Sequence, residues 1–69
     1  MPLTMVPSGS ASTVKYINGK DEIRHFLNSL GFAEGCEVTV VSELGNNLIL
    51  TVKNARVALS KRLAILIQV

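Results

Sequence analysis

Two side chains of this sequence could act as a nucleophile and a base, and they are its only cysteine and its only histidine. Cys36 and His25 lie eleven residues apart. Nucleophilic catalysis needs a nucleophile beside a base that a third group orients. His25 falls off the apolar stripe of a predicted helix, and Cys36 alternates with Val38 and Val40, which is typical of a small core residue. The pattern therefore predicts no catalytic pair, and we expect that the protein is not an enzyme.

Side chains that could bind a metal are equally sparse. A structural zinc site needs four Cys or His ligands at fixed spacing, and the sequence has only two such residues. An oxygen-rich site could use Asp21, Glu22 and His25, which partly share one helix face. The positive end of a helix explains the same two acids more simply. We therefore expect no cofactor, no catalytic or metal-ligating residue, and at most weak binding of a divalent metal at the surface.

Basic side chains gather in the last third of the sequence. Residues 1–43 carry three basic and five acidic side chains, a net charge of −2, whereas residues 44–69 carry four basic and no acidic ones, a net charge of +4. Ordinary scatter over a solvated surface would explain this asymmetry, and so would a face that meets an acidic partner. The residues of that face, called the basic set below, are Lys53, Arg56, Lys61 and Arg62. No phosphate-loop motif occurs and the aromatic residues lie elsewhere, so we expect no nucleic-acid partner.

One helix is predicted together with its end. Residues 21–30 carry apolar side chains at the i, i+3, i+4 and i+7 spacing of an amphipathic helix, namely Ile23, Phe26, Leu27 and Leu30. Gly31 follows at once, where a left-handed backbone conformation commonly ends a helix. A helix of ten residues is not stable alone. We therefore expect all four apolar side chains to be buried, with the helix covering one opening of a barrel.

Short strands account for most of the remaining chain. Alternating apolar residues or β-branched composition predict them at residues 10–17, 36–43, 48–53, 55–59 and 63–69. Val41 breaks the alternation and indicates either a bend or a second buried face. Residues 45–47 and Asn54 are turn signals, and residues 60–62 are typical of one tight or 3₁₀ turn. Short strands at close spacing favour a small antiparallel barrel, because closure leaves no exposed strand edge.

Length and composition set the remaining bounds. Sixty-nine residues are expected to form one domain, 1–69, whose core is marginal for its size. A single cysteine excludes an internal disulfide, and only three residues are aromatic, so we expect an aliphatic core. No apolar run reaches the length of a membrane span, and the first residues lack the pattern of a secretory signal. These features favour a cytoplasmic protein that does not insert into the membrane.

The segment Leu30–Val41, LGFAEGCEVTVV, resembles the FeoA family, ferrous iron transport protein A. The family pattern is a helix ending in Leu-Gly-apolar, two further residues, a Gly, and a strand of the type x-x-Val-x-Val-Val. The resemblance extends over nearly the whole chain, from the lead-in at residues 3–9 to RVALSKRLA at residues 56–64. Glu34 and Cys36 depart from it, because a proline and a small hydroxyl residue are common at these positions, and neither change threatens the fold.

The resemblance implies a small SH3-like antiparallel β-barrel of about five strands with one short helix at residues 21–30. It also implies a cytosolic accessory protein of ferrous iron transport and iron homeostasis that binds the cytoplasmic part of a FeoB-type permease. The apolar lead-in Leu3, Met5 and Val6, which a short chain is not expected to bury fully, is a second candidate contact surface. The alternative function is a metal-binding regulatory domain, because metal-dependent repressors of the DtxR type contain a similar barrel. Tight Fe²⁺ or Mn²⁺ binding by the isolated chain would favour that alternative.

Overall fold

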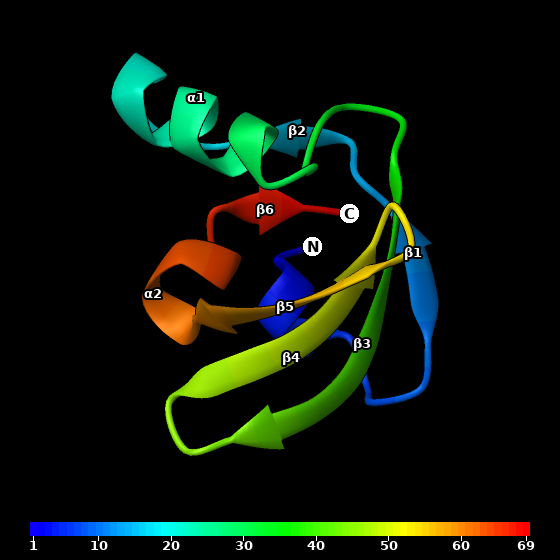
Figure 1. Ribbon diagram of the computed structural model, residues 1–69. Coiled ribbons are helices and arrows are strands. Elements are labelled where there is room, and N and C mark those ends of the chain that lie inside the picture. Colours follow the sequence, from blue (N-terminus) through cyan, green and yellow to red (C-terminus); the bar gives the residue numbers. More distant parts are fainter.

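The larger of two sheets in the computed structural model, which describes residues 1–69, has four antiparallel strands (Figure 1). Its strand order is β1-β3-β4-β5, and its strands are β1 (Ala11–Thr13), β3 (Glu37–Leu44), β4 (Asn47–Val52) and β5 (Ala55–Ser60). A second antiparallel sheet consists of β2 (Tyr16–Ile17) and β6 (Ile67–Gln68). The mostly β fold is confirmed, with six strands in place of about five. Because β1 and β5 each pair on one side only, two edges stay free where a closed barrel would have none.

The predicted strand at residues 10–17 is wrong in one respect, because the chain divides it between the two sheets. β1 pairs with β3, whereas β2 pairs with β6. Between them, the Val14 N–H donates to the Cys36 carbonyl at 2.9 Å, and the Lys15 N–H donates to the Gln68 carbonyl at 2.7 Å. Two successive residues thus bond to different partners, and the chain crosses from one sheet to the other at this point.

The last part of the chain also differs from the prediction. A short helix, α2 (Lys61–Ala64), replaces the predicted tight turn and the first residues of the predicted strand 63–69, of which only β6 remains. Ser60 is the N-cap of α2, and its hydroxyl accepts a hydrogen bond from the Leu63 N–H. Such a side-chain acceptor favours a helix start. A continuous apolar run is compatible with helix and strand alike, which is why the sequence pattern did not separate them.

The hairpin of β3 and β4 follows the predicted alternation. Leu48, Leu50 and Val52 of β4 are buried, as are Val38 and Val40 of β3. The pairing register shifts between residues 40 and 42 of β3, which leaves residue 41 without a partner. This β-bulge confirms the predicted irregularity at that position, since one extra residue in a strand bends it.

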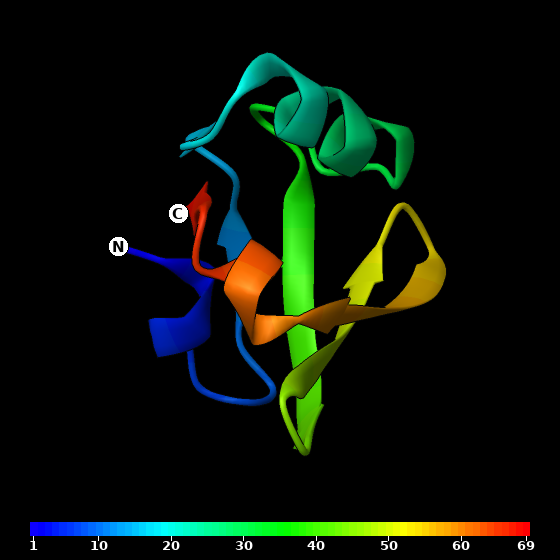
Figure 2. The same cartoon turned by 90° about the vertical axis from the view of Figure 1, so that its left-hand side faces the viewer.

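The helix α1 (Asp21–Ser29) ends as predicted but buries less of its apolar stripe than predicted. Only Leu27 is fully buried, whereas Ile23 and Leu30 are half-buried and Phe26 is 51% exposed. The expectation of four buried side chains is therefore wrong. The helix lies at the margin of the molecule (Figures 1 and 2). Burial shows that only part of its apolar stripe reaches the core.

The turn after α1 explains which phenylalanine enters the core. Gly31 has a φ of +109°, its N–H donates to the Asn28 carbonyl at 3.0 Å, and the Phe32 N–H donates to the Leu27 carbonyl at 3.0 Å. These two bonds form the Schellman motif that a glycine beyond the last helical turn permits. The predicted positive φ at Gly31 is confirmed, and the motif directs Phe32 inward, where it is fully buried.

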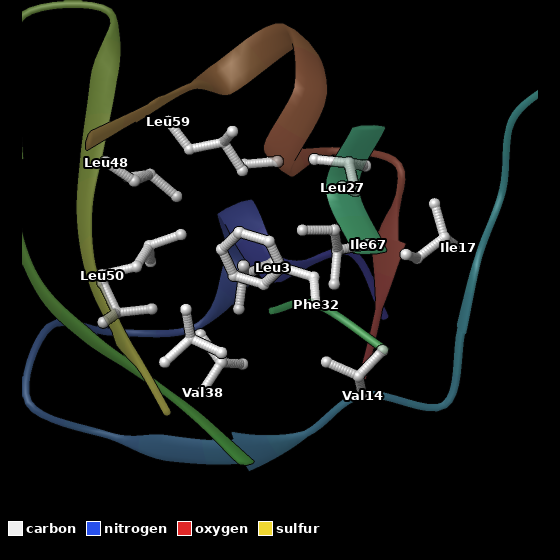
Figure 3. Packing of buried hydrophobic residues seen from close by; sticks show 13 residues of the cluster. Leu3, Val14, Ile17, Leu27, Phe32, Val38, Leu48, Leu50, Leu59 and Ile67 are labelled. Atoms are coloured by element: carbon white, nitrogen blue, oxygen red, sulfur yellow. The ribbon is translucent and has the colours of Figure 1, made fainter. Parts of the chain in front are cut away.

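Thirteen hydrophobic residues form one core cluster. The ring of Phe32 lies near its centre (Figure 3), and the other twelve are aliphatic, as predicted: Leu3, Val14, Ile17, Leu27, Val38, Val40, Leu48, Leu50, Val52, Leu59, Ala64 and Ile67. Leu3 belongs to a 3₁₀ helix, η1 (Leu3–Met5), so the expectation that the lead-in stays partly unburied is wrong for this residue and right for the exposed Met5. The two ends of the chain lie side by side, and the Val69 N–H donates to the Met1 carbonyl at 2.8 Å (Figure 2).

The two-residue turn between β4 and β5 holds a lysine in a conformation that suits other residues better. Lys53 has a φ of +49° and Asn54 a φ of +64°. Positive φ at both positions defines the type I′ turn, which favours Asn at the first and Gly at the second. We expect Lys53→Asn to raise the free energy of unfolding by about 0.5–1 kcal/mol, because asparagine tolerates this conformation at lower cost. Urea denaturation measures this difference.

The matched control for the turn variant is Lys15→Asn, because Lys15 is also exposed but its φ is not positive. The same change of side chain is expected to leave the free energy of unfolding within about 0.5 kcal/mol there. Equal effects of the two variants would contradict the explanation from backbone conformation.

Candidate functional site

The basic set lies along β5 and does not converge on one point. Lys53 belongs to the turn before β5, Arg56 lies on β5 opposite Thr51, and Lys61 and Arg62 begin α2 directly after β5. At about 3.4 Å per residue, the five steps from position 56 to position 61 span about 17 Å. The structure therefore places the four residues in two groups, one near each end of β5.

One member of the basic set already has an acidic partner within the chain. The Lys61 Nζ lies 3.2 Å from an Oε2 atom of Glu43, and both side chains are partly exposed. The other ion pair of the protein joins Arg24 to Asp21 within α1. Lys53, Arg56 and Arg62 take part in neither, so these three cations are available to a partner.

A hollow of about 410 Å³ lies between α1 and α2, next to the end of β5. Its apolar lining consists of Ile23, Leu63 and Leu66, which are half-buried, and its polar lining consists of Ser60 and Arg62. Phe26, one helical turn after Ile23, extends the apolar stripe of α1 into solvent. Apolar side chains with an arginine at their rim are typical of the surfaces that proteins use to bind one another.

The hydrophobic pattern of the sequence does not predict this hollow, although it contains the apolar residues that line it. The stripe of α1 and the apolar run at residues 63–69 together contain more apolar surface than a small core can cover. This excess of apolar surface is the only feature of the sequence that points to an exposed apolar hollow. Which side chains stay uncovered depends on how α1 and α2 pack, and the hydrophobic pattern does not contain that information.

Cys36 lies outside the core, so its prediction as a core residue is wrong. It is half-buried in the turn before β3, where its N–H donates to the Ala33 carbonyl at 3.0 Å. It lines a polar hollow of about 270 Å³ whose other residues are Glu37, Thr39, Thr51, Lys53 and Asn54. His25 is exposed on α1, as predicted, and lines none of the hollows.

No group of three or more His, Cys, Asp or Glu side chains comes close enough to hold a metal ion. Asp21 and Glu22 occupy the first turn of α1, where the helix dipole favours negative charge, and Asp21 pairs with Arg24. The core that holds the fold together is entirely hydrophobic.

We expect the fold to be independent of metal and of the thiol. A chelator should leave the thermal midpoint unchanged, because no cluster of ligands supports the core. Cys36→Ser should change the free energy of unfolding by less than about 1 kcal/mol, since the thiol is half-buried at a polar hollow. Differential scanning calorimetry with and without chelator measures both effects. A stoichiometric metal that survives dialysis, or unfolding on chelation, would contradict this prediction.

Comparisons with known proteins agree on one family. The model of the FeoA domain matches residues 1–69. The solution structure of iron(II) transport protein A from Clostridium thermocellum superposes with a TM-score of 0.92 at 27% identity, covering 99% of this chain and 43% of that one. The chain thus spans less than half the length of that protein. A search of curated proteins found no match.

Two crystal structures of FeoA proteins are also similar over most of both chains. An iron uptake regulatory protein (FeoA) superposes with a TM-score of 0.87 at 30% identity, covering 96% of this chain and 88% of that one. FeoA from Stenotrophomonas maltophilia was crystallised with zinc and is described as an SH3 domain protein. It superposes with a TM-score of 0.85 at 28% identity, covering 99% of this chain and 87% of that one. The mostly β fold described above is therefore SH3-like. No helix of the present structure is long and apolar enough to cross a membrane.

Proposed function

Because the chain belongs to the FeoA family, which is associated with ferrous iron transport, we propose that it is an accessory protein that binds the cytoplasmic part of a FeoB-type ferrous iron permease. The observation that carries this proposal is the surface around β5 and α2. Three cations without an acidic partner in the chain lie along this surface, and one of them, Arg62, lines an apolar hollow. Such a surface suits a protein partner, and the proposed function places the chain on the cytoplasmic side of the membrane.

The contact residues are proposed from the basic set. Arg56 and Arg62 are exposed and carry no ion pair, and they lie on β5 and α2 respectively. Lys53 lies at the turn, where a lysine is held in a conformation that favours asparagine. Strain at an exposed residue is often retained for function, and this lysine fits that pattern. Lys61 is a weaker candidate, because Glu43 already satisfies part of its charge.

We expect the double variant Arg56→Glu with Arg62→Glu to weaken binding to a recombinant cytoplasmic fragment of the cognate permease by about tenfold or more, since two attractive contacts become repulsive. Isothermal titration calorimetry at two salt concentrations measures the change. A strain that depends on this uptake route should lose uptake of radiolabelled ferrous iron to a corresponding extent.

The matched control is Lys15→Glu with Lys20→Glu, which makes the same change in net charge at exposed positions away from β5 and α2. Circular dichroism checks that both double variants are folded. Equal affinity of the two would exclude the basic set as the contact surface. Failure of the wild-type chain to bind the fragment, together with normal uptake after its deletion, would contradict the proposed function itself.

A further inference from the structure

β5 presents a free strand edge in the middle of the proposed contact surface. It is the outermost strand of the larger sheet, and its only strand partner is β4. The backbone groups on the free side of an edge strand can pair with an extended segment of another chain, which is how several peptide-binding domains add a strand. The edge can therefore form directional hydrogen bonds with a partner, in addition to the charged and apolar contacts of the surface around it.

The hydrogen-bond pattern shows which backbone groups are free. The Lys61 N–H donates to the Asn46 carbonyl at 2.9 Å, one step beyond the last pair of the β4–β5 ladder. Bonding alternates along an antiparallel ladder, so the odd-numbered residues of β5 bond to β4. The N–H and C=O groups of Arg56 and Ala58 consequently face the free edge. No turn or loop hydrogen bond of the protein uses them.

The side chains around this edge differ between the two faces of the sheet. On the outer face, Arg56 and Ala58 are exposed. On the inner face, Val57 packs against the core and is half-buried. The apolar hollow with Ile23 and Leu63 adjoins the α2 end of the strand. Figure 2 shows α1 and the hairpin of β4 and β5 on the same side of the molecule.

We propose that the free edge of β5 receives an extended segment of the partner by strand addition, and that this segment alternates acidic and apolar side chains. An acidic residue on the outer face would lie across from Arg56 as a cross-strand pair. Apolar residues on the inner face would cover Val57 and reach toward the hollow. The proposal rests on the proposed function, because it places this segment in the cytoplasmic part of the permease. Residues 44–69 carry four basic and no acidic side chains, so acidic residues at any position of the partner segment would be attracted to this part of the chain.

A polyproline ligand, the other extended segment that SH3-like folds bind, fits this surface less well. Grooves for such ligands are lined by aromatic side chains. The exposed aromatic residues here are Tyr16 on β2 and Phe26 on α1, and neither belongs to β5 or α2. The backbone edge is therefore the feature that can hold an extended segment in register.

Ala58→Pro tests the proposal directly. Proline removes the N–H that points to the free edge while leaving the bonds to β4 intact, and edge strands tolerate it. Ala11→Pro is the matched control. Ala11 is exposed on β1 at the opposite edge of the same sheet, and the bond from the Val40 N–H to the Ser10 carbonyl shows that the Ala11 N–H also faces outward. Circular dichroism and the thermal midpoint verify that both variants fold.

Two probes test separately whether β5 accepts an added strand and whether the permease is the partner. The first is a synthetic peptide of alternating glutamate and valine, added to the full chain while amide exchange is followed by nuclear magnetic resonance. Slower exchange of the Arg56 and Ala58 amides supports strand addition, and protection elsewhere or none overturns it. The second probe is the cytoplasmic fragment of the permease, whose affinity should fall about tenfold or more in Ala58→Pro and stay unchanged in Ala11→Pro.

The outcomes differ for the two hypotheses. Equal fragment affinity of the wild type and Ala58→Pro overturns strand addition and leaves the permease as partner. Protection by the peptide without any binding of the fragment supports the receptive edge and contradicts the permease as partner. If sedimentation shows a wild-type dimer that Ala58→Pro dissociates, the edge serves a second copy of this chain, and the proposed acidic segment is wrong.

Discussion

Phe32→Ala is expected to lower the free energy of unfolding by about 3–5 kcal/mol, as for other large truncations in a packed core. Phe32 is fully buried and lies near the centre of the cluster, where twelve aliphatic residues surround it (Figure 3). A chain of this length has a total stability of about 3–10 kcal/mol at the usual 0.05–0.15 kcal/mol per residue. The variant should therefore be partly or wholly unfolded at room temperature, as measured by urea denaturation.

Phe26→Ala makes the same chemical change six residues earlier and is the matched control. Phe26 is 51% exposed, so its truncation loses only part of the transfer free energy of a buried ring, and alanine favours the helix more than phenylalanine does. We expect Phe26→Ala to lower the free energy of unfolding by less than about 1 kcal/mol. A loss in Phe26→Ala as large as that in Phe32→Ala would show that α1 packs more deeply than the structure describes.

Gly31→Val is expected to destabilise the protein by about 2–4 kcal/mol, through two effects at one position. A φ of +109° is strained for any residue with a Cβ atom, and most strained for a β-branched one. A Cβ atom built at this position would lie 3.5 Å from both γ-methyl groups of Val52. The first carbon fits, but the two further methyl groups of valine would press against a fully buried side chain.

Gly35→Val separates the two effects. Gly35 has a φ of +85°, yet a Cβ atom there would meet nothing within 4 Å. Only the backbone strain remains in this variant, and we expect the free energy of unfolding to fall by about 1–2 kcal/mol. Thermal unfolding of both variants checks the difference. If Gly31→Val were no worse than Gly35→Val, the expected steric clash between the added methyl groups and Val52 would be excluded.

Local chemistry in the sequence predicted several elements correctly because the information lies within a few residues. The apolar spacing and Gly31 defined α1 to within one residue of its end. Strict alternation identified the buried residues of β4, and its interruption at Val41 located the bulge in β3. Segments without such local signals were predicted less well. The apolar run at residues 63–69 divides into α2 and β6 because Ser60 provides a helix cap, which is a single side-chain bond.

For the contact surface, the sequence by itself determined which residues are charged and which are apolar, and thus the excess of positive charge after residue 43. The tertiary structure alone decided that Lys61 is paired with Glu43, that Phe32 is buried in place of Phe26, and that β5 is an edge strand beside a hollow. The physical reason is that these properties depend on contacts between segments distant in the chain. Glu43 lies on β3 and Lys61 on α2, and the apolar residues that line the hollow come from Ile23 on α1 and from residues 63–66, more than 35 positions later in the chain.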